Sequence, residues 1–125
     1  MEQRFALLLQ AEVISQKAHD NCLHALRLLD SELGLSHDNE QYQMALTHLS
    51  RAADRIWQGE EIEEGLDADI LSEIYDDPES DTVLALHRKT LNAMDLNHVS
   101  SNEEGFLIAN AYALFQLSKS QEMSV

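Results

Sequence analysis

Apolar residues recur every three or four positions along the N-terminal part of the chain. This spacing puts side chains on one face of an α-helix. The stripe predicts one continuous helix over about residues 3–32. Gly34 is expected to end it, because helices commonly end at a residue with positive φ. The apolar face comprises Leu7, Ala11, Ile14, Ala18, Cys22, Ala25 and Leu29.

A second apolar stripe follows the polar tract SHDNEQ. Ser36 or Asp38 is expected to be its N-cap, because such side chains accept hydrogen bonds from the free N–H groups of a first helical turn. The helix is predicted to end near Trp57 and Gly59. Its apolar face comprises Tyr42, Ala45, Leu46, Leu49, Ala52, Ala53 and Ile56.

Two shorter helices are predicted next. The acidic stretch EEIEEG forms a solvated connection with a turn at Gly65. A short third helix covers about residues 66–75. Pro78 suits the first turn of a fourth helix capped by Asp77, since proline has no N–H to lose there. That helix continues through residues 83–94.

The last helix is predicted to open at Ser101, which forms an S-x-x-E capping box with Glu104. Its apolar face begins at Phe106 and continues to Leu117. Alternating apolar and polar residues, typical of a strand, do not compete in any segment. The pattern therefore predicts an all-α fold, a bundle of five helices.

Length and charge narrow the class of protein. The 125 residues suffice for one domain, expected over residues 1–120, followed by a polar tail at 121–125 that frays. A net charge of −15 disfavours binding to nucleic acid or to an anionic membrane surface, which needs clustered Lys and Arg. The apolar N-terminal run is too short to span a bilayer and carries no signal-peptide cleavage pattern. We expect a cytoplasmic protein.

The six histidines raise the question of a metal site. Di-metal carboxylate bundles place a Glu three residues before each ligating His, and none of the six has one. The single cysteine, Cys22, lies on an apolar stripe, where it behaves as a small hydrophobe. His87 also lies on an apolar face, whereas His37 and His98 are expected in loops. We therefore expect no metal, no cofactor and no enzymatic activity.

His48 has unusual neighbours. Met44, Arg51 and Arg55 lie four, three and seven residues from it, which places all four side chains along one stripe of a helix. Nearby arginines would keep the imidazole neutral and would hold a phosphoryl group bonded to it, because guanidinium donors fork onto phosphate oxygens. In the alternative interpretation, the two arginines simply pair with some of the abundant acids.

Three stretches, in order, resemble the PTS regulation domain. They are LGLSHDNEQYQMALTHLSRAADRIWQGEEIEE, ILSEIYDD and SSNEEGFLIANAYALF, and the resemblance covers about residues 5–118. It implies a compact five-helix bundle that occurs in bacterial transcription antiterminators and activators. In that family, proteins of the phosphoenolpyruvate-dependent sugar phosphotransferase system phosphorylate histidines of the domain, which typically works as a dimer.

The first histidine motif of that family is matched in part. The family usually has an acid just before the histidine and an aromatic residue three positions after it, where this chain has Thr47 and Arg51. The matching positions are His48, Leu49, Ala52 and Arg55.

The second motif of the family is degenerate. The position of its histidine falls on Asn110, which cannot accept a phosphoryl group, so the resemblance leaves one histidine site rather than two. We expect Asn110 to form hydrogen bonds inside the bundle or at an interface. The matching positions before it are Asn102, Glu103, Phe106 and Leu107.

The leading hypothesis is a stand-alone regulatory domain resembling the PTS regulation domain. His48 would be the phosphoacceptor for the phosphocarrier proteins, with Arg51 and Arg55 as the phosphate-binding residues. A second macromolecule, either a protein partner or a second copy in a homodimer, would receive the signal. In the alternative hypothesis, the bundle is an adaptor that binds a metabolic enzyme or a regulator without phosphorylation.

Overall fold

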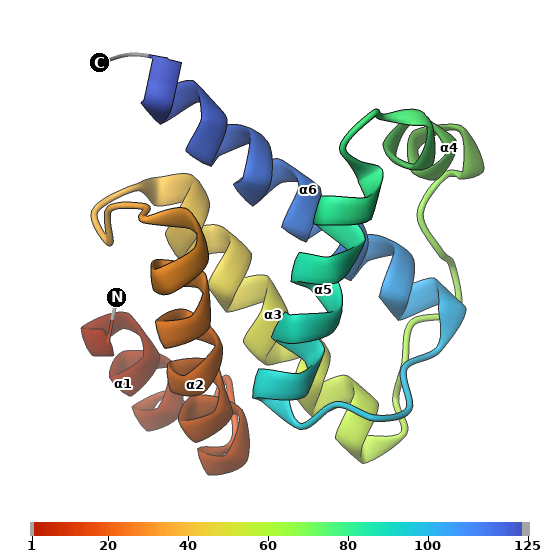
Figure 1. The fold of residues 1–125 in the computed structure, drawn as a ribbon. Coiled ribbons are helices and arrows are strands. Elements are labelled where there is room, and N and C mark those ends of the chain that lie inside the picture. The colour runs from red at the N-terminus through yellow and green to blue at the C-terminus, as the bar shows by residue number, and fades with distance from the viewer. Residues whose placement is uncertain (1, 124–125) are drawn as a thin grey trace.

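The computed structural model describes residues 2–123, without the side chains of residues 121–123. Helices make up 76% of the described residues, which contain no strand, so the predicted all-α fold is confirmed. Within residues 2–123 the helices number six rather than the expected five (Figure 1). The end of the tail predicted to fray, residues 124–125, lies outside the described residues. The helices are α1 (Glu2–Gln10), α2 (Gln16–Leu33), α3 (Glu40–Gln58), α4 (Ala68–Asp76), α5 (Ser80–Met94) and α6 (Ser101–Met123).

The additional helix arises because the segment predicted as one first helix is broken into two, α1 and α2. Between α1 and α2, Glu12 adopts a φ of 60°, in the left-handed region that a helix cannot continue through. Ser15 then caps α2, since its hydroxyl accepts a hydrogen bond from the Ala18 N–H at 3.1 Å. The prediction of one helix over residues 3–32 is therefore wrong.

Asp54, on α3, holds this break in place. Its Oδ2 accepts a hydrogen bond from the Ser15 N–H at 2.8 Å, and its Oδ1 accepts one from the Ser15 hydroxyl. Both hydrogen-bond donors of Ser15 are therefore bonded to a residue 39 positions away in the chain. The local apolar spacing carries no trace of such a contact.

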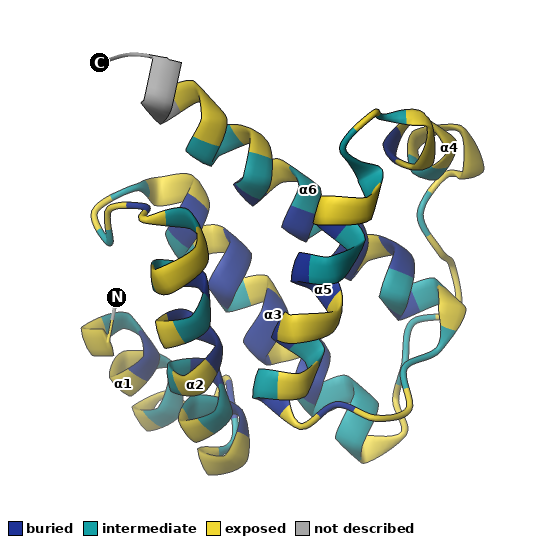
Figure 2. Cartoon of the chain, viewed as in Figure 1, coloured by how far each residue is buried: buried dark blue, intermediate teal, exposed yellow. Residues whose placement is uncertain are grey.

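The helices enclose one apolar core, and their buried residues face inward (Figure 2). Both α2 and α6 pack against α3 and α5. Cys22 is fully buried in this core, as predicted, and burial raises the pKa of its thiol to about 12. The largest fully buried side chains are Tyr42, Phe5, Leu26, Leu29, Leu46, Met94 and Ile108. None of the helices within residues 2–123 combines the length and the apolar character needed to cross a membrane.

Two glycines end helices as predicted, whereas the N-cap of α3 differs. Gly34 and Gly59, with φ of 64° and 73°, follow α2 and α3. The cap of α3 is Asn39, whose side chain accepts a hydrogen bond from the N–H three residues on, rather than Ser36 or Asp38. An N-cap must lie directly before the first helical turn, and α3 begins later than the sequence pattern suggested.

Asp77 and Pro78 lie in the turn between α4 and α5, not in the first turn of α5. Asp77 follows the end of α4, and its carboxylate accepts hydrogen bonds from the Glu79 N–H and the Tyr112 hydroxyl, both at 2.8 Å. The predicted cap at Asp77 is therefore wrong, because its side chain supports this turn and binds α6 instead.

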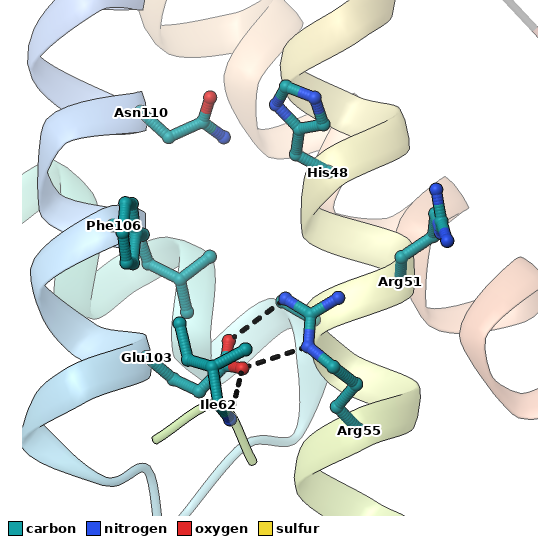
Figure 3. Close-up of a pocket in the computed structure, with 9 residues that line it drawn as sticks. His48, Arg51, Arg55, Ile62, Glu103, Phe106 and Asn110 are labelled. Carbon is teal, nitrogen blue, oxygen red and sulfur yellow. Dashed lines mark hydrogen bonds and ion pairs between the residues drawn. The ribbon is translucent and has the colours of Figure 1, made fainter. Parts of the chain in front are cut away.

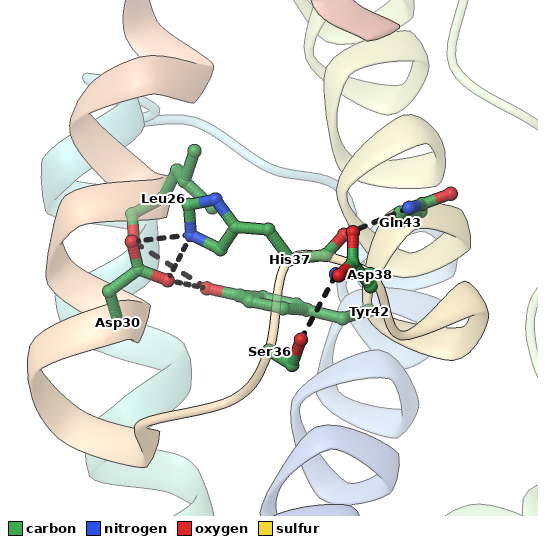
Figure 4. A network of polar contacts seen from close by, with 7 residues as sticks. All are labelled: Leu26, Asp30, Ser36, His37, Asp38, Tyr42 and Gln43. Atoms are coloured by element: carbon green, nitrogen blue, oxygen red, sulfur yellow. Dashed lines mark hydrogen bonds and ion pairs between the residues drawn. The ribbon is translucent and has the colours of Figure 1, made fainter. Parts of the chain in front are cut away.

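A polar network fixes the connection between α2 and α3 (Figure 4). The Asp30 carboxylate accepts a hydrogen bond from the buried Tyr42 hydroxyl at 2.9 Å and contacts the His37 Nε2 at 2.8 Å. Burial and the adjacent carboxylate raise the pKa of Tyr42. His37 lies in the loop, as predicted, and its backbone oxygen accepts a hydrogen bond from the Gln43 side chain. Asp30 therefore ties the loop and the first turn of α3 to the end of α2.

His87 lies on the core side of α5, as predicted, with 4% of its surface exposed. Burial, together with the positive charge of Arg88, lowers the pKa of its imidazole to about 4. The ring is therefore neutral at physiological pH.

We expect Ser15→Ala to lower the free energy of unfolding by about 1 kcal/mol, since an N-cap hydroxyl contributes that much and Asp54 also loses a donor. Urea unfolding followed by circular dichroism measures the change. Ser72→Ala, at an exposed position of α4, is the matched control and should change little. Equal effects of the two substitutions would contradict the role given to Ser15.

We expect stability to fall as the pH drops from about 6.5 towards 4 because of His87. In this window the unfolded state binds a proton at its ordinary pKa, whereas the folded ring stays neutral because its pKa is about 4. His87→Leu should therefore flatten the dependence of the urea midpoint on pH in this window. His24→Leu, at an exposed site on α2, is the control, and identical profiles for the two variants would refute the assignment.

Candidate functional site

A pocket of about 350 Å³ lies between α3 and α6 (Figure 3). Four residues of each helix line it at the same spacing, namely one position followed by those three, four and seven residues on. Such a set covers one face of a helix, so two matching stripes face each other across the pocket. The lining residues are His48, Arg51, Ala52 and Arg55 from α3; Glu103, Phe106, Leu107 and Asn110 from α6; and Ile62 from the connection before α4.

An ion pair closes one end of this pocket. Arg55 donates to both carboxylate oxygens of Glu103, from Nε at 2.9 Å and from Nη2 at 3.2 Å. Glu103 is 1% exposed, whereas the Arg55 side chain is 37% exposed. A buried carboxylate needs such donors because removing a charge from water is costly. This side-on pairing leaves the Nη1 edge of Arg55 directed away from Glu103 in Figure 3.

The loop after α3 is fastened to the start of α6 beside this ion pair. The Ile62 N–H donates to Glu103 at 3.2 Å, and the Asn102 side chain donates to the Glu63 backbone oxygen at 2.7 Å. Gly65 packs so closely here that a Cβ atom would lie 2.8 Å from the Asn102 side-chain oxygen. The pocket wall formed by Ile62 therefore depends on α6.

The N-cap of α6 is Ser100 rather than the predicted Ser101. Its hydroxyl accepts a hydrogen bond from the Glu103 N–H at 3.3 Å. In a capping box the Glu103 side chain would return to the Ser100 N–H, but here Glu61 accepts that hydrogen bond at 3.2 Å. The Glu103 carboxylate is thereby free to pair with Arg55.

The other end of the pocket holds His48 and Asn110. His48 is exposed, and it lies across from Asn110 in Figure 3. The Asn110 side chain donates to the Ala45 backbone oxygen at 3.0 Å, which is the kind of hydrogen bond inside the bundle that we expected. Residues of the two sequence motifs, 62 positions apart, thus share one pocket.

The two arginines near His48 differ in their surroundings. Arg51 is exposed and points away from the centre of the pocket in Figure 3, and it also lines a neighbouring hollow beside the turn after α1. Arg55 forms an ion pair with Glu103. For this arginine, the structure shows the pairing with an acid that the alternative interpretation proposed. The sequence motifs named both Arg55 and Glu103, but no local signal indicated that they pair.

Comparison with known proteins gives one family relationship. The chain is 35% identical to YhfY, an uncharacterized protein of Escherichia coli K12, over 121 residues that cover 97% of this chain and 99% of YhfY. The chain belongs to the YhfY family. No model of a known protein family matches it, and no solved structure matches it.

In the described part of this YhfY family member, no three His, Cys, Asp or Glu residues lie together in a way that could hold a metal ion. The pocket around His48 instead combines cationic, amide and apolar side chains. Its volume lies at the low end of the range of about 300–1,000 Å³ that small-molecule pockets span.

We expect Arg55→Ala to lower the free energy of unfolding by about 2 kcal/mol. This loss is smaller than for a fully buried ion pair, because Arg55 is partly exposed. It is still substantial, because Glu103 would stay buried without its cation. Urea unfolding measures the loss. Lys89→Ala, which removes an exposed ion pair with Glu32, is the control and should cost less than about 1 kcal/mol. Losses of the same size would contradict a special role for Glu103.

Proposed function

We propose that the protein is a regulatory helical bundle of the PTS regulation domain type, acting in the cytoplasm and controlled by phosphorylation of His48. One observation carries the proposal. The two stripes that resemble the two histidine motifs of that family face each other across a single pocket. The described residues form six helices, where the resemblance implied five, because a break separates α1 from α2.

The position of His48 supports phosphorylation by another protein. Its exposure gives a phosphorylated donor direct access to the ring, and the pocket beside it offers space for the transferred group. In the transfer, an imidazole nitrogen of His48 bonds to phosphorus while the bond between phosphorus and the donor breaks. The proposed donors are the phosphocarrier proteins of the sugar phosphotransferase system.

Two cations are placed to respond to the new charge. Arg51 is exposed next to His48, and Arg55 lines the same pocket while pairing with Glu103. A phosphoryl group adds strong acceptor oxygens, so it would compete with Glu103 for the Arg55 guanidinium. Weakening the ion pair would loosen the contact between α3 and α6 together with the loop at Ile62. A second copy or a protein partner would detect this change.

We expect His48 to become labelled when the protein is incubated with labelled phosphoenolpyruvate and the purified general phosphocarrier enzymes. The label should be acid-labile, as on a phosphohistidine, and should be absent from His48→Ala. His24→Ala and His98→Ala, at two other exposed histidines, are the matched controls and should label normally. Arg51→Ala should reduce the rate of labelling. No label, or a label that persists in His48→Ala, would refute the proposal.

A second candidate function, an adaptor that is not phosphorylated, is favoured by apolar side chains around the same site. Phe106 lines the pocket and is 42% exposed, and Met44, one turn before His48, is 48% exposed. Exposed apolar groups around a hollow are typical of a protein-binding surface. Two results together would favour this function. The phosphorylation assay would give no label, and binding to a partner would be lost in Met44→Ser and Phe106→Ser but kept in His48→Ala.

A further inference from the structure

A second, smaller cavity lies inside the bundle between α2, α3, α5 and α6. Leucine side chains form most of its wall, and its polar lining residues are His87, Thr90 and Asn110. The centre of a water molecule can occupy about 20 Å³ of it. This is enough for one water molecule, which needs roughly 10–15 Å³ by the same measure, and too little for a larger ligand.

One polar atom of a residue that lines this cavity lacks a hydrogen-bond partner. His87 Nε2 is buried and has no hydrogen-bond partner among the described residues. Buried polar atoms are nearly always hydrogen-bonded, to protein or to an ordered water. A cavity lined only by leucine would stay dry, but a polar wall changes the preferred occupant.

The other two polar residues have acceptor capacity to spare. Thr90 donates its hydroxyl proton to the Leu86 backbone oxygen at 2.8 Å, which leaves a lone pair on its Oγ1. Asn110 donates from Nδ2 to the Ala45 backbone oxygen, which leaves its Oδ1 as an acceptor. A neutral His87 with its proton on Nε2 would add one donor. One water could then accept one hydrogen bond and donate two, the usual number for a buried water.

We propose that this cavity is a binding site for a single structural water, which accepts a hydrogen bond from His87 Nε2–H and donates to Thr90 Oγ1 and Asn110 Oδ1. The water ties α5 to α6 through their side chains. It also fixes the Asn110 amide with its Nδ2 towards α3, at the position where Asn110 forms part of the wall of the His48 pocket. The site does not depend on phosphorylation of His48.

A high-resolution crystal structure of the full chain at neutral pH tests the proposal. We expect an ordered water about 2.7–3.2 Å from His87 Nε2. The same water should appear in His48→Ala, which separates this site from the proposed phosphorylation. A cavity without density for a water in the unmodified protein would overturn the proposal.

Nuclear magnetic resonance of nitrogen-15-labelled histidine gives a second, independent readout in solution. The proposed geometry requires the neutral tautomer with the proton on Nε2. A His87 ring protonated on Nδ1 alone would overturn the proposed arrangement, because Nε2 could not then donate to the water.

The urea midpoint of His87→Leu distinguishes a water bound to His87 Nε2 from an Nε2 atom without any hydrogen-bond partner. If Nε2 has no partner, His87→Leu at neutral pH removes a buried unsatisfied group and should raise the urea midpoint. If the water is bound, the same change leaves Thr90 and Asn110 without it, so the midpoint should fall or stay level. His24→Leu, at an exposed site, is the control for the general effect of leucine. A midpoint raised above that control would count against the water.

Discussion

The contact between α3 and α6 depends on one buried carboxylate. Glu103 is almost fully buried, and a carboxylate in that position is tolerated only where donors surround it. Arg55 supplies two of these donors and the Ile62 backbone supplies a third. The end of α3 and the loop after it therefore meet the start of α6, 48 and 41 residues further along the chain, at a single side chain. The same interaction sets how the two helical stripes face each other, and so it defines the pocket beside His48.

This arrangement links the stability of the bundle to the chemistry of its candidate site. Arg55 is a structural cation, and it is also one of the two arginines beside the histidine that we propose as phosphoacceptor. Arg55 already neutralises the buried charge of Glu103. If Arg55 turned to a new negative charge, Glu103 would stay in the interior without its cation, which is costly. In the proposed function, a new charge at His48 would therefore bear on how α3 is held against α6.

The spacing of residues along the chain predicted well those features that depend on residues close together in the sequence. The apolar spacing placed Cys22 and His87 in the core, and the αL positions of Gly34 and Gly59 end the helices where the pattern indicated. The tract SSNEEG was ambiguous, because both serines are followed by a glutamate three residues later. At Ser100, the distant Glu61 takes the place that the Glu103 carboxylate would have in a capping box, and Glu103 pairs with Arg55 instead.

The sequence by itself determined the helical class, the apolar faces of α2 and α3 and the residues worth testing around His48. The apolar face predicted for the first stripe was wrong in part, because Leu7 is 65% exposed. Only the tertiary structure decided where the first helix breaks and which acid Arg55 pairs with. The physical reason is the same in both cases. The hydrogen bonds that decide them join Ser15 to Asp54 and Arg55 to Glu103, across 39 and 48 residues of chain. Periodicity records which face of a helix is apolar, but not which distant polar group that helix will meet.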